Sequence, residues 1–360
     1  MKIFENWIKG FFLLLIILIT SISIFNFFID SAGIFGNKSY LSKSATDLVS
    51  GKMIAGLTDY DERLFHSLII KKDKQKVDTI ILGSSRAMVT RKKFVVNKKS
   101  VFFNHSVSGA SLEDYMAVVD LYETKRKYIP KNIIIGIDPW IFNKFNGQLR
   151  WSSWKDNYFD ILAKVMNKKI DNKFSLNSIK WKQLINYDYT ISNIFFLKRN
   201  FNRDPYYITS ILDIEDSVRD LDASLYYPLS LRNPDSKLVK KRALSFVTKG
   251  QVYSLEKFER LDNIDEFEKF IIYLKNRDIN VSFALFPYNP ITYNLLVKDK
   301  DYIIIQEVEE YLKQFARDNK LRVFGSYNPD KFNFKNSDFS DGMHGLEIIS
   351  KTILQEYKRN

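Results

Sequence analysis

Two short motifs near opposite ends of the chain hold residues that could perform nucleophilic catalysis. The first is Ser85, in the run VDTIILGSSR of residues 77–86, where an apolar, β-branched segment ends at a glycine. The second is the pair Asp341 and His344, in a chain with only three histidines. A serine nucleophile needs a neighbouring base, which a third group orients. We interpret Ser85 as the nucleophile, His344 as the base and Asp341 as the group that orients it. A turn capped by a serine would also produce the first motif.

A parallel sheet would bring the two motifs together. Buried strands are predicted over 77–82, before Ser85, and over Leu321–Phe324, before the loop that carries His344. The carboxyl ends of parallel strands lie at one edge of the sheet, where open α/β folds keep their chemistry. Further strands alternate with helices, which favours such a sheet. These strands are Lys99–Phe103, Asn132–Ile137 and Val281–Phe286, and the helices are Asp61–Lys71, a helix after Ser111, Asp265–Arg277, Tyr302–Asp318 and Leu346–Tyr357.

The loop after the strand at 99–103 could stabilise an oxyanion. Gly109 follows that strand, has no side chain to block a substrate, and precedes Ser111 and Asp114, which resemble a helix capping box. Backbone N–H groups at a tight turn before a helix are suitable donors to a developing oxyanion. The N–H groups of Gly109 and of Ser85 itself are therefore the predicted donors.

The N-terminal region contains a segment long enough to cross a membrane. Residues Phe11–Ile29 carry no charge, and a helix of that length spans about 28 Å, close to the thickness of a hydrocarbon core. Lys2 and Lys9 precede the segment and Asp30 follows it, which predicts a cytoplasmic amino terminus and an extracytoplasmic remainder. A cleavable signal peptide is an alternative, with a poor cleavage site at 31–33. A buried core helix is disfavoured because the run is apolar all round.

These patterns divide the chain into an anchor and one exported domain. We expect a cytoplasmic tail at 1–10, the membrane anchor at 11–29, and a linker with the first helices at 30–76. The catalytic domain then occupies 77–360. Within it, residues 148–252 interrupt the alternation of strands and helices, and we predict a mostly helical or irregular insertion or lid over one end of the sheet.

The composition excludes several classes of function. The chain of 360 residues has no cysteine, so disulfides, thiol catalysis and cysteine-based zinc sites are excluded. Its net charge of +13 comes from scattered lysines, and no basic-aromatic motif indicates nucleic-acid binding. No pair of residues at metal-ligand spacing appears beyond Asp341 and His344, so no metal or other cofactor is expected.

Other side chains near the predicted sheet edge have two interpretations each. His66 is interpreted as a packed or half-exposed histidine, and His105 either touches substrate or is structural. Arg86 could bind a substrate carboxylate or pair with Asp138 or Asp114. The tryptophans could form a sugar-stacking platform or belong to the core; they are Trp140, Trp151 and Trp154. Arg86, Asp138 and Trp140 are thus the candidate substrate-binding residues.

The motifs, in their order along the chain, resemble the SGNH/GDSL hydrolase superfamily. Members of that superfamily share a Gly-x-Ser block, an oxyanion glycine and a carboxy-terminal Asp-x-x-His, matched here by Gly83, Ser85, Gly109, Asp341 and His344. The resemblance implies a three-layer α/β/α, doubly wound, mostly parallel sheet. It also implies that Ser85, His344 and Asp341 form the catalytic triad.

A narrower resemblance is to the membrane-anchored acyltransferase-like branch, which includes the alginate O-acetyltransferase proteins and relatives of the teichoic-acid D-alanine transfer protein. It is carried by the serine motif, by an Asn-x-x-x-x-Gly block that begins at Asn104, by GIDPW at 136–140 and by FSDGMH at 339–344, behind the anchor. The similarity covers about residues 8–35, 77–143 and 260–360. The insertion matches no family pattern.

One position departs from the superfamily. Its third block is Gly-x-Asn-Asp, whose asparagine donates to the oxyanion, whereas this chain has Asp138 after Gly136. An ionised carboxylate cannot donate a hydrogen bond. Either Asn104, Asn143 or Arg86 replaces that donor, or the oxyanion hole has fewer donors than in the hydrolases.

The resemblance implies O-acyl transfer, most often of acetyl, to a cell-surface polysaccharide or glycolipid. Ser85 would carry the acyl group, and a polytopic membrane-bound O-acyltransferase would be the partner that supplies it. An anchored esterase that removes acyl groups would use the same residues. A non-catalytic glycan-binding scaffold is the other alternative, motivated by Asp138.

Overall fold

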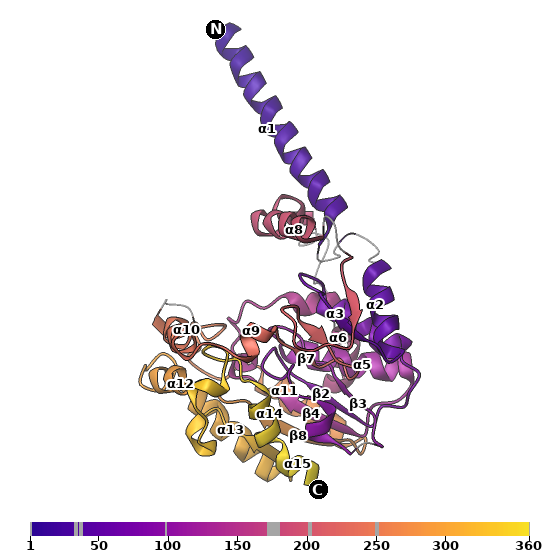
Figure 1. The fold of residues 1–360 in the computed structure, drawn as a ribbon, viewed down its shortest axis with the longest axis vertical. Coiled ribbons are helices and arrows are strands. Elements are labelled where there is room, and N and C mark those ends of the chain that lie inside the picture. The colour runs from indigo at the N-terminus through magenta and orange to yellow at the C-terminus, as the bar shows by residue number, and fades with distance from the viewer. Residues whose placement is uncertain are drawn as a thin grey trace.

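The structure is a computed structural model that describes residues 2–31, 35, 39–97, 99–170, 181–200, 204–248 and 252–359. Helix α1 (Lys2–Ile29) projects from a body of helices and two β-sheets (Figure 1). Most of the alternative cleavage site at 31–33, and the insertion residues 171–180, 201–203 and 249–251, lie outside the described residues.

The larger sheet has five parallel strands, which confirms the predicted parallel arrangement. Its order is β3-β2-β4-β8-β9. The strands are β2 (Thr79–Leu82), β3 (Phe102–Asn104), β4 (Asn132–Gly136), β8 (Asn280–Leu285) and β9 (Arg322–Gly325). The chain moves from β2 outward to β3 and then returns to β4 on the other side of β2. This reversal is a topological switch point, and ligands of open α/β sheets bind beside such points.

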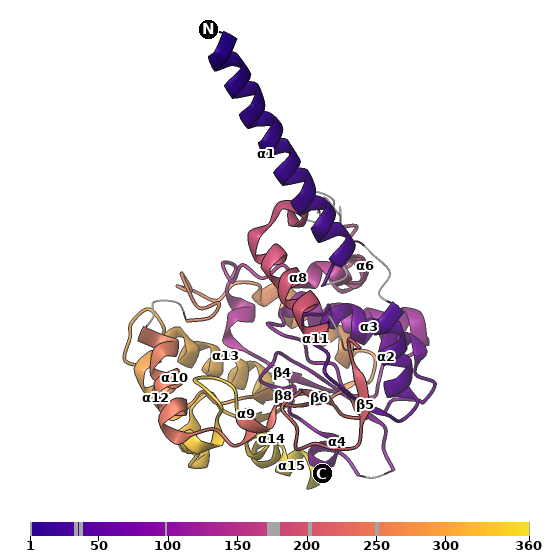
Figure 2. The same ribbon diagram turned by 45° about the horizontal axis from the view of Figure 1, so that its top comes forward.

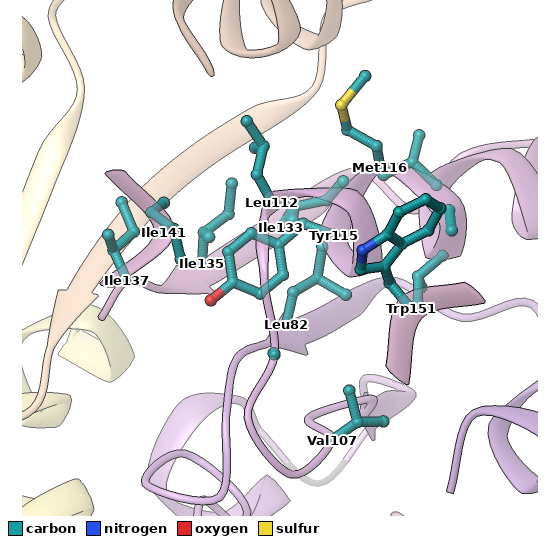
Figure 3. Close-up of a cluster of buried hydrophobic side chains, with 14 of the residues drawn as sticks. Leu82, Val107, Leu112, Tyr115, Met116, Ile133, Ile135, Ile137, Ile141 and Trp151 are labelled. Carbon is teal, nitrogen blue, oxygen red and sulfur yellow. The ribbon is translucent and has the colours of Figure 1, made fainter. Parts of the chain in front are cut away.

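Both faces of this sheet are buried, which explains why its strands are continuous apolar runs. Along β2, Ile80 and Leu82 belong to one apolar cluster, whereas Ile81 belongs to another on the opposite face. Figure 3 shows part of the larger cluster, where Leu82, Ile133 and Ile135 meet side chains of α5. Helices α5 (Leu112–Leu121), α11 (Ile264–Lys275) and α13 (Ile304–Asp318) supply the larger cluster; α4 (Lys92–Val95) and α14 (Glu347–Ile353) supply the smaller.

Helix α5 begins with the predicted capping box. Asp114 accepts hydrogen bonds from the backbone N–H and the hydroxyl of Ser111. Both oxygens of Asp114 also accept from Arg63, each at 2.8 Å, on helix α3 (Glu62–Lys72). Asp61 caps α3 and sits where the sequence placed the start of that helix. The buried ion pair therefore joins two helices that pack on the same side of the sheet.

A second, antiparallel sheet adds a feature that the sequence did not predict. In its described part, the segment 148–252 is mostly helical or irregular, as expected, but it also contains three short strands. These pair with a strand from the segment 30–76 in the order β5-β1-β6-β7. The strands are β1 (Met53–Ala55), β5 (Tyr207–Thr209), β6 (Val218–Arg219) and β7 (Leu225–Tyr226). Runs of two or three residues are too short to show a two-residue period.

The remaining elements lie around the two sheets (Figures 1 and 2). The predicted closing helix is two helices, α14 and α15 (Gln355–Arg359), with the break at Leu354. The other helices are α2 (Ser39–Val49), η1 (Tyr122–Arg126), η2 (Pro139–Phe142), η3 (Arg150–Trp154), α6 (Lys155–Met166), η4 (Gln183–Ile185), α8 (Tyr187–Asn200), α9 (Leu229–Arg232), α10 (Ser236–Thr248), α12 (Pro290–Leu296), η5 (Pro329–Phe332) and η6 (Asn336–Asp338).

Helix α1 is long and apolar enough to cross a membrane or to serve as a signal anchor. Its side chains between Phe11 and Ile19 are exposed, so the helix is not part of the protein core. Among the described residues, its main contacts with the rest of the chain are with η4 and α8, where Asn26 of its last turns forms hydrogen bonds.

The pair between Asp114 and Arg63 is expected to contribute strongly to stability. Asp114→Ala leaves a buried guanidinium unpaired and removes the cap of α5, so we expect a loss of about 3–5 kcal/mol in the free energy of unfolding. Urea unfolding followed by circular dichroism measures the change. Asp265→Ala is the matched control, since Asp265 lies in the first turn of α11 with its side chain 68% exposed and pairs only with Lys269. The control should lose less than about 1 kcal/mol, and equal losses for both variants would contradict the assignment.

Candidate catalytic site

The structure brings Ser85, His344 and Asp341 into one hydrogen-bonded chain. The Oγ of Ser85 lies 2.8 Å from Nε2 of His344, and Nδ1 of His344 lies 2.8 Å from Oδ2 of Asp341. A carboxylate can only accept, so Nδ1 carries a proton and Nε2 is free to accept the serine hydroxyl. All three side chains are partly exposed, with 26% of His344 accessible. The group can therefore reach a substrate from solvent.

The nucleophile lies on the loop that leaves β2 at the centre of the sheet. A tight turn follows the strand, in which the N–H groups of Ala87 and Met88 bond to the carbonyls of Ser84 and Ser85. Ser84 is buried, whereas Ser85 is half-exposed. Of the two serines in the Gly-Ser-Ser motif, the second is therefore the candidate nucleophile.

His344, the candidate base, lies on the loop after β9 and is oriented by Asp341 on the same loop. Oδ1 of Asp341 accepts the backbone N–H groups of Met343 and His344, each at 2.8 Å, while Oδ2 accepts the imidazole. The N–H of Ser340 bonds back to the carbonyl of His344 and closes the loop. One carboxylate thus fixes both the backbone and the imidazole of this loop.

The same contacts determine the charge of Asp341. Burial by itself would raise the pKa of this carboxyl, but the hydrogen bond and charge of His344 and the two backbone donors outweigh burial and hold the pKa below its usual value. Asp341 is therefore ionised at neutral pH and stabilises an imidazolium whenever His344 takes up a proton.

Residues outside the loop of His344 also contact that loop at Gly342. The N–H of Asn289, after β8, donates to the carbonyl of Gly342. A side chain at Gly342 would approach Phe246 of α10 to 2.7 Å and Thr292 of α12 to 2.8 Å, so only glycine fits this close approach. Helices from the insertion and from the main domain therefore clamp the loop that positions His344.

Gly109 lies on the loop that runs beside the nucleophile loop. The N–H groups of His105 and Val107 donate to the carbonyls of Ile81 and Gly83, so the two chains continue side by side beyond the strands. Gly109 has a φ of +56°, which favours glycine. Within the described residues, neither its N–H nor that of Ser85 has a hydrogen-bond acceptor. Both backbone donors predicted from the sequence are therefore unoccupied.

The side-chain donors considered from the sequence are committed elsewhere. The amide nitrogen of Asn104 donates to the carbonyls of Ala87, Met88 and Thr90, which fixes the nucleophile loop from below. The amide of Asn143 donates to the carbonyls of Ser254 and Glu256. The tentative placement of Asn104 in an oxyanion hole is therefore not supported, because its donors already have acceptors.

Arg86 and Asp138 form a buried ion pair and do not face a substrate. Nη1 of Arg86 lies 2.7 Å from Oδ1 of Asp138, and each side chain is almost fully buried. Nη2 donates to the carbonyl of Phe286, and the guanidinium lies over the ring of Tyr288. Burial raises the pKa of Asp138, against the opposing effect of Arg86. Of the two interpretations of Arg86, pairing with Asp138 is correct and the substrate-binding prediction for both residues is wrong.

The tryptophans belong to the core, which was one of the two interpretations. Trp140 is buried and its indole N–H donates to the carbonyl of Ala110 at 2.9 Å. Trp151 and Trp154 are also buried, the latter bonded to Ser67. The substrate-binding prediction for Trp140 is therefore wrong.

His105 is a structural residue paired with His66. Their Nδ1 atoms lie 3.1 Å apart, and Nε2 of His105 lies 2.8 Å from the hydroxyl of Tyr122. Burial lowers the pKa of His105 to about 3, and burial together with His105 lowers that of His66 well below its usual value. Both rings are therefore neutral at physiological pH, and one Nδ1–H donates to the other Nδ1.

Tyr227 is a residue of the site that the sequence did not reveal. It follows β7 in the insertion, its hydroxyl donates to the carbonyl of Ser85 at 3.2 Å, and its ring contacts His344 edge-on. Burial and the nearby charge of Asp341 raise its pKa, so it remains a neutral donor. No motif surrounds Tyr227, and only the pairing of distant short strands places it here.

No group of residues suited to hold a metal ion occurs in the described part of the chain. No model of a known protein family matches the chain, and no curated protein sequence matches it significantly.

The neutral histidine pair predicts a distinctive acid sensitivity. The folded pKa of His105 is about 3 and that of an unfolded histidine is about 6.5, so the unfolded state binds more protons between these values. The contribution of His105 to the free energy of unfolding is therefore fully present above the pKa of the unfolded state. As the pH falls below that pKa, the contribution decreases by about 1.4 kcal/mol per pH unit.

We expect His105→Gln to flatten the dependence of stability on pH by about one proton between pH 6.5 and pH 5. Urea unfolding of both proteins at several pH values in this range measures the slope. Lys300→Gln is the control for loss of a basic side chain, since Lys300 is exposed, and it should leave the slope unchanged. A slope unaffected by His105→Gln would mean that His105 is protonated in the folded protein.

Proposed function

We propose that this protein is a membrane-anchored serine acyltransferase of SGNH type that transfers an acyl group, most often acetyl, to a cell-surface polysaccharide or glycolipid. The observation that carries the proposal is the contact of 2.8 Å between Ser85 Oγ and His344 Nε2, with Asp341 on the other imidazole nitrogen. The five-stranded parallel sheet, covered on both faces, agrees with the three-layer arrangement of that superfamily.

The first half-reaction uses the geometry in a direct way. As Ser85 Oγ attacks the acyl carbonyl, its proton passes to Nε2 of His344, and the imidazolium is stabilised by ionised Asp341. The oxyanion accepts the N–H groups of Ser85 and Gly109. The C–O bond to the donor then breaks, and His344 returns its proton to the leaving oxygen.

The second half-reaction runs through the same atoms. A glycan hydroxyl gives its proton to His344 Nε2 and attacks the acyl carbon of the Ser85 ester. The Ser85 C–O bond breaks, and Oγ recovers the proton from His344. Water in place of the glycan hydroxyl would give hydrolysis, so exclusion of water from the acyl-enzyme separates a transferase from an esterase.

The buried pair of Arg86 and Asp138 removes one hydrogen-bond donor from the proposed oxyanion hole. The position where the hydrolases carry a donating asparagine holds a carboxylate that is occupied by Arg86. The oxyanion hole then depends on backbone donors alone. Loss of one donor typically lowers the rate by about 10²–10³, so we expect slow turnover of simple esters.

The catalytic assignment is tested with 4-nitrophenyl acetate. Ser85→Ala and His344→Ala should each lower kcat by on the order of 10⁴ or more relative to the wild type, because either change removes a member of the relay. Ser84→Ala is the matched control: the neighbouring serine is buried and its change should lower kcat by less than about tenfold. Hydrolysis that survives Ser85→Ala would exclude the mechanism.

The acceptor distinguishes transfer from hydrolysis. The wild type is first acetylated on Ser85, which mass spectrometry detects, and is then mixed with unmodified cell-wall polysaccharide. Acetyl ester on the glycan supports transfer. Free acetate at the same rate with and without glycan supports the esterase, and glycan binding without any acyl-enzyme supports the scaffold.

Tyr227 is expected to position the nucleophile. Tyr227→Phe removes the hydrogen bond to the Ser85 carbonyl and keeps the ring that contacts His344. One neutral hydrogen bond is worth about 1 kcal/mol, so kcat for 4-nitrophenyl acetate should fall by about fivefold with KM unchanged. Tyr311→Phe is the control, because its hydroxyl bonds to Glu268 and its described contacts include none of the site residues. A change in KM alone for Tyr227→Phe would indicate substrate binding instead of positioning.

A further inference from the structure

Helix α8 has the reverse of the polarity expected for a helix on a water-soluble surface. Its side toward the protein carries polar groups, with Asn193 fully buried and the hydroxyl of Tyr189 bonded to Asp30. Its outward side carries large apolar side chains, including Tyr187 and Phe195, which are 76% and 61% exposed. Surface helices in water place apolar residues inward and polar residues outward.

The exposed apolar surface continues beyond α8. We define the α8 surface by its exposed large side chains, which come from α8, from η4 and from the residue two positions before η4. They are Trp181, Ile185, Tyr187, Ile194, Phe195 and Leu197. Large exposed apolar side chains gathered on neighbouring elements mark contact with another molecule or with a membrane. Three exposed charged residues accompany these side chains in the sequence, namely Lys182, Asp188 and Lys198.

Polar contacts fix this surface to the end of α1. The amide nitrogen of Asn26 donates to the carbonyl of Leu184 and to the hydroxyl of Thr190, and its oxygen accepts from Asn193. The N–H of Ser31 donates to the side-chain oxygen of Asn193. Figures 1 and 2 both show α8 against the end of α1 that meets the body. An asparagine near the end of an apolar helix is thus fully satisfied by η4 and α8.

The position of this contact along α1 determines how deep the α8 surface would lie in a bilayer. Asn26 lies one turn before the end of the apolar run, and the 19 residues from Phe11 to Ile29 span about 28 Å. A bilayer core of about 30 Å crossed by this run would therefore end near Asn26 and Asp30. The α8 surface then lies at the boundary between acyl chains and headgroups, where aromatic side chains are favoured and lysines reach the lipid phosphates.

We propose that α8 and η4 lie in the interface of the bilayer that α1 crosses, with the α8 surface in contact with lipid. The occupant is the lipid surface, because the exposed apolar side chains adjoin the end of a helix long and apolar enough to span a membrane, and because aromatic side chains such as Tyr187 are favoured at the boundary between acyl chains and headgroups. The catalytic domain is then attached at two places, by the span and by the interfacial helix.

The absence of cysteine allows a direct test with the full chain. Single variants Phe195→Cys and Tyr187→Cys, both on the α8 surface, are labelled with an environment-sensitive fluorophore and placed in vesicles of phosphatidylethanolamine and phosphatidylglycerol. Leu14→Cys, in the middle of α1, and Leu244→Cys, an exposed position on α10, are the matched controls. Lipids with quenchers at different depths, and aqueous iodide, report the position of each label.

Shallow quenchers should act most strongly on labels at Phe195 and Tyr187, since interfacial helices lie about 5–10 Å below the headgroup boundary. Deep quenchers should act most on Leu14, and only iodide should reach Leu244. Iodide quenching at Phe195 and Tyr187 equal to that at Leu244 would overturn the proposal. Protection of both labels from lipid and aqueous quenchers alike would also overturn it and would indicate a protein partner or a second copy. A Leu14 label that deep quenchers do not reach would show that α1 does not cross the bilayer and would overturn the proposal as well.

Discussion

The guanidinium of Arg86 joins the segments that follow three neighbouring strands, and the geometry of the candidate catalytic site depends on that junction. Arg86 follows the nucleophile on the β2 loop, pairs with Asp138 after β4, and donates to the carbonyl of Phe286 after β8. A buried pair of this kind is costly to desolvate and strongly destabilising to break. Its effect here is positional, because the residue beside Ser85 cannot move without leaving a charge unpaired.

The base reaches this junction from a distant strand. In the order β3-β2-β4-β8-β9, β9 is three strands from β2, which corresponds to about 14 Å across the sheet. The loop after β9 must cross that distance to place His344 beside Ser85. Asn289, after β8, holds Gly342 part of the way across. Each strand between nucleophile and base therefore contributes a contact at its carboxyl end.

The sequence predicted the parallel sheet and the meeting of its two motifs because both follow from local patterns. Buried β-branched runs mark strands such as β2, and parallel pairing fixes the edge at which Ser85 and His344 emerge. The sequence could not show whether Arg86 binds substrate or forms a buried ion pair, since its burial depends on residues distant in the sequence, such as Phe286. The same reason hid the β1, β5, β6 and β7 sheet, whose strands are short and pair across long separations.

The insertion contacts both loops that carry the candidate catalytic residues. The N–H of Leu225 donates to the carbonyl of Met88 on the nucleophile loop, and the N–H of Asn104 donates to the carbonyl of Asp222. Helix α10 packs on Gly342 in the loop of the base. The insertion thus braces both loops of the relay.

The same segment, 148–252, also contributes α8 and its contacts with α1. If α8 lies in the membrane interface, the chain segment that supports Ser85 and His344 is also the one that fixes the height of the domain above the bilayer. A single spanning helix would leave the domain free to tilt, whereas two attachments restrict it. The restriction would favour the proposed acyl transfer from a membrane-bound donor, because the entropy of orienting the domain would be lost once, on attachment, and not at each encounter with the donor.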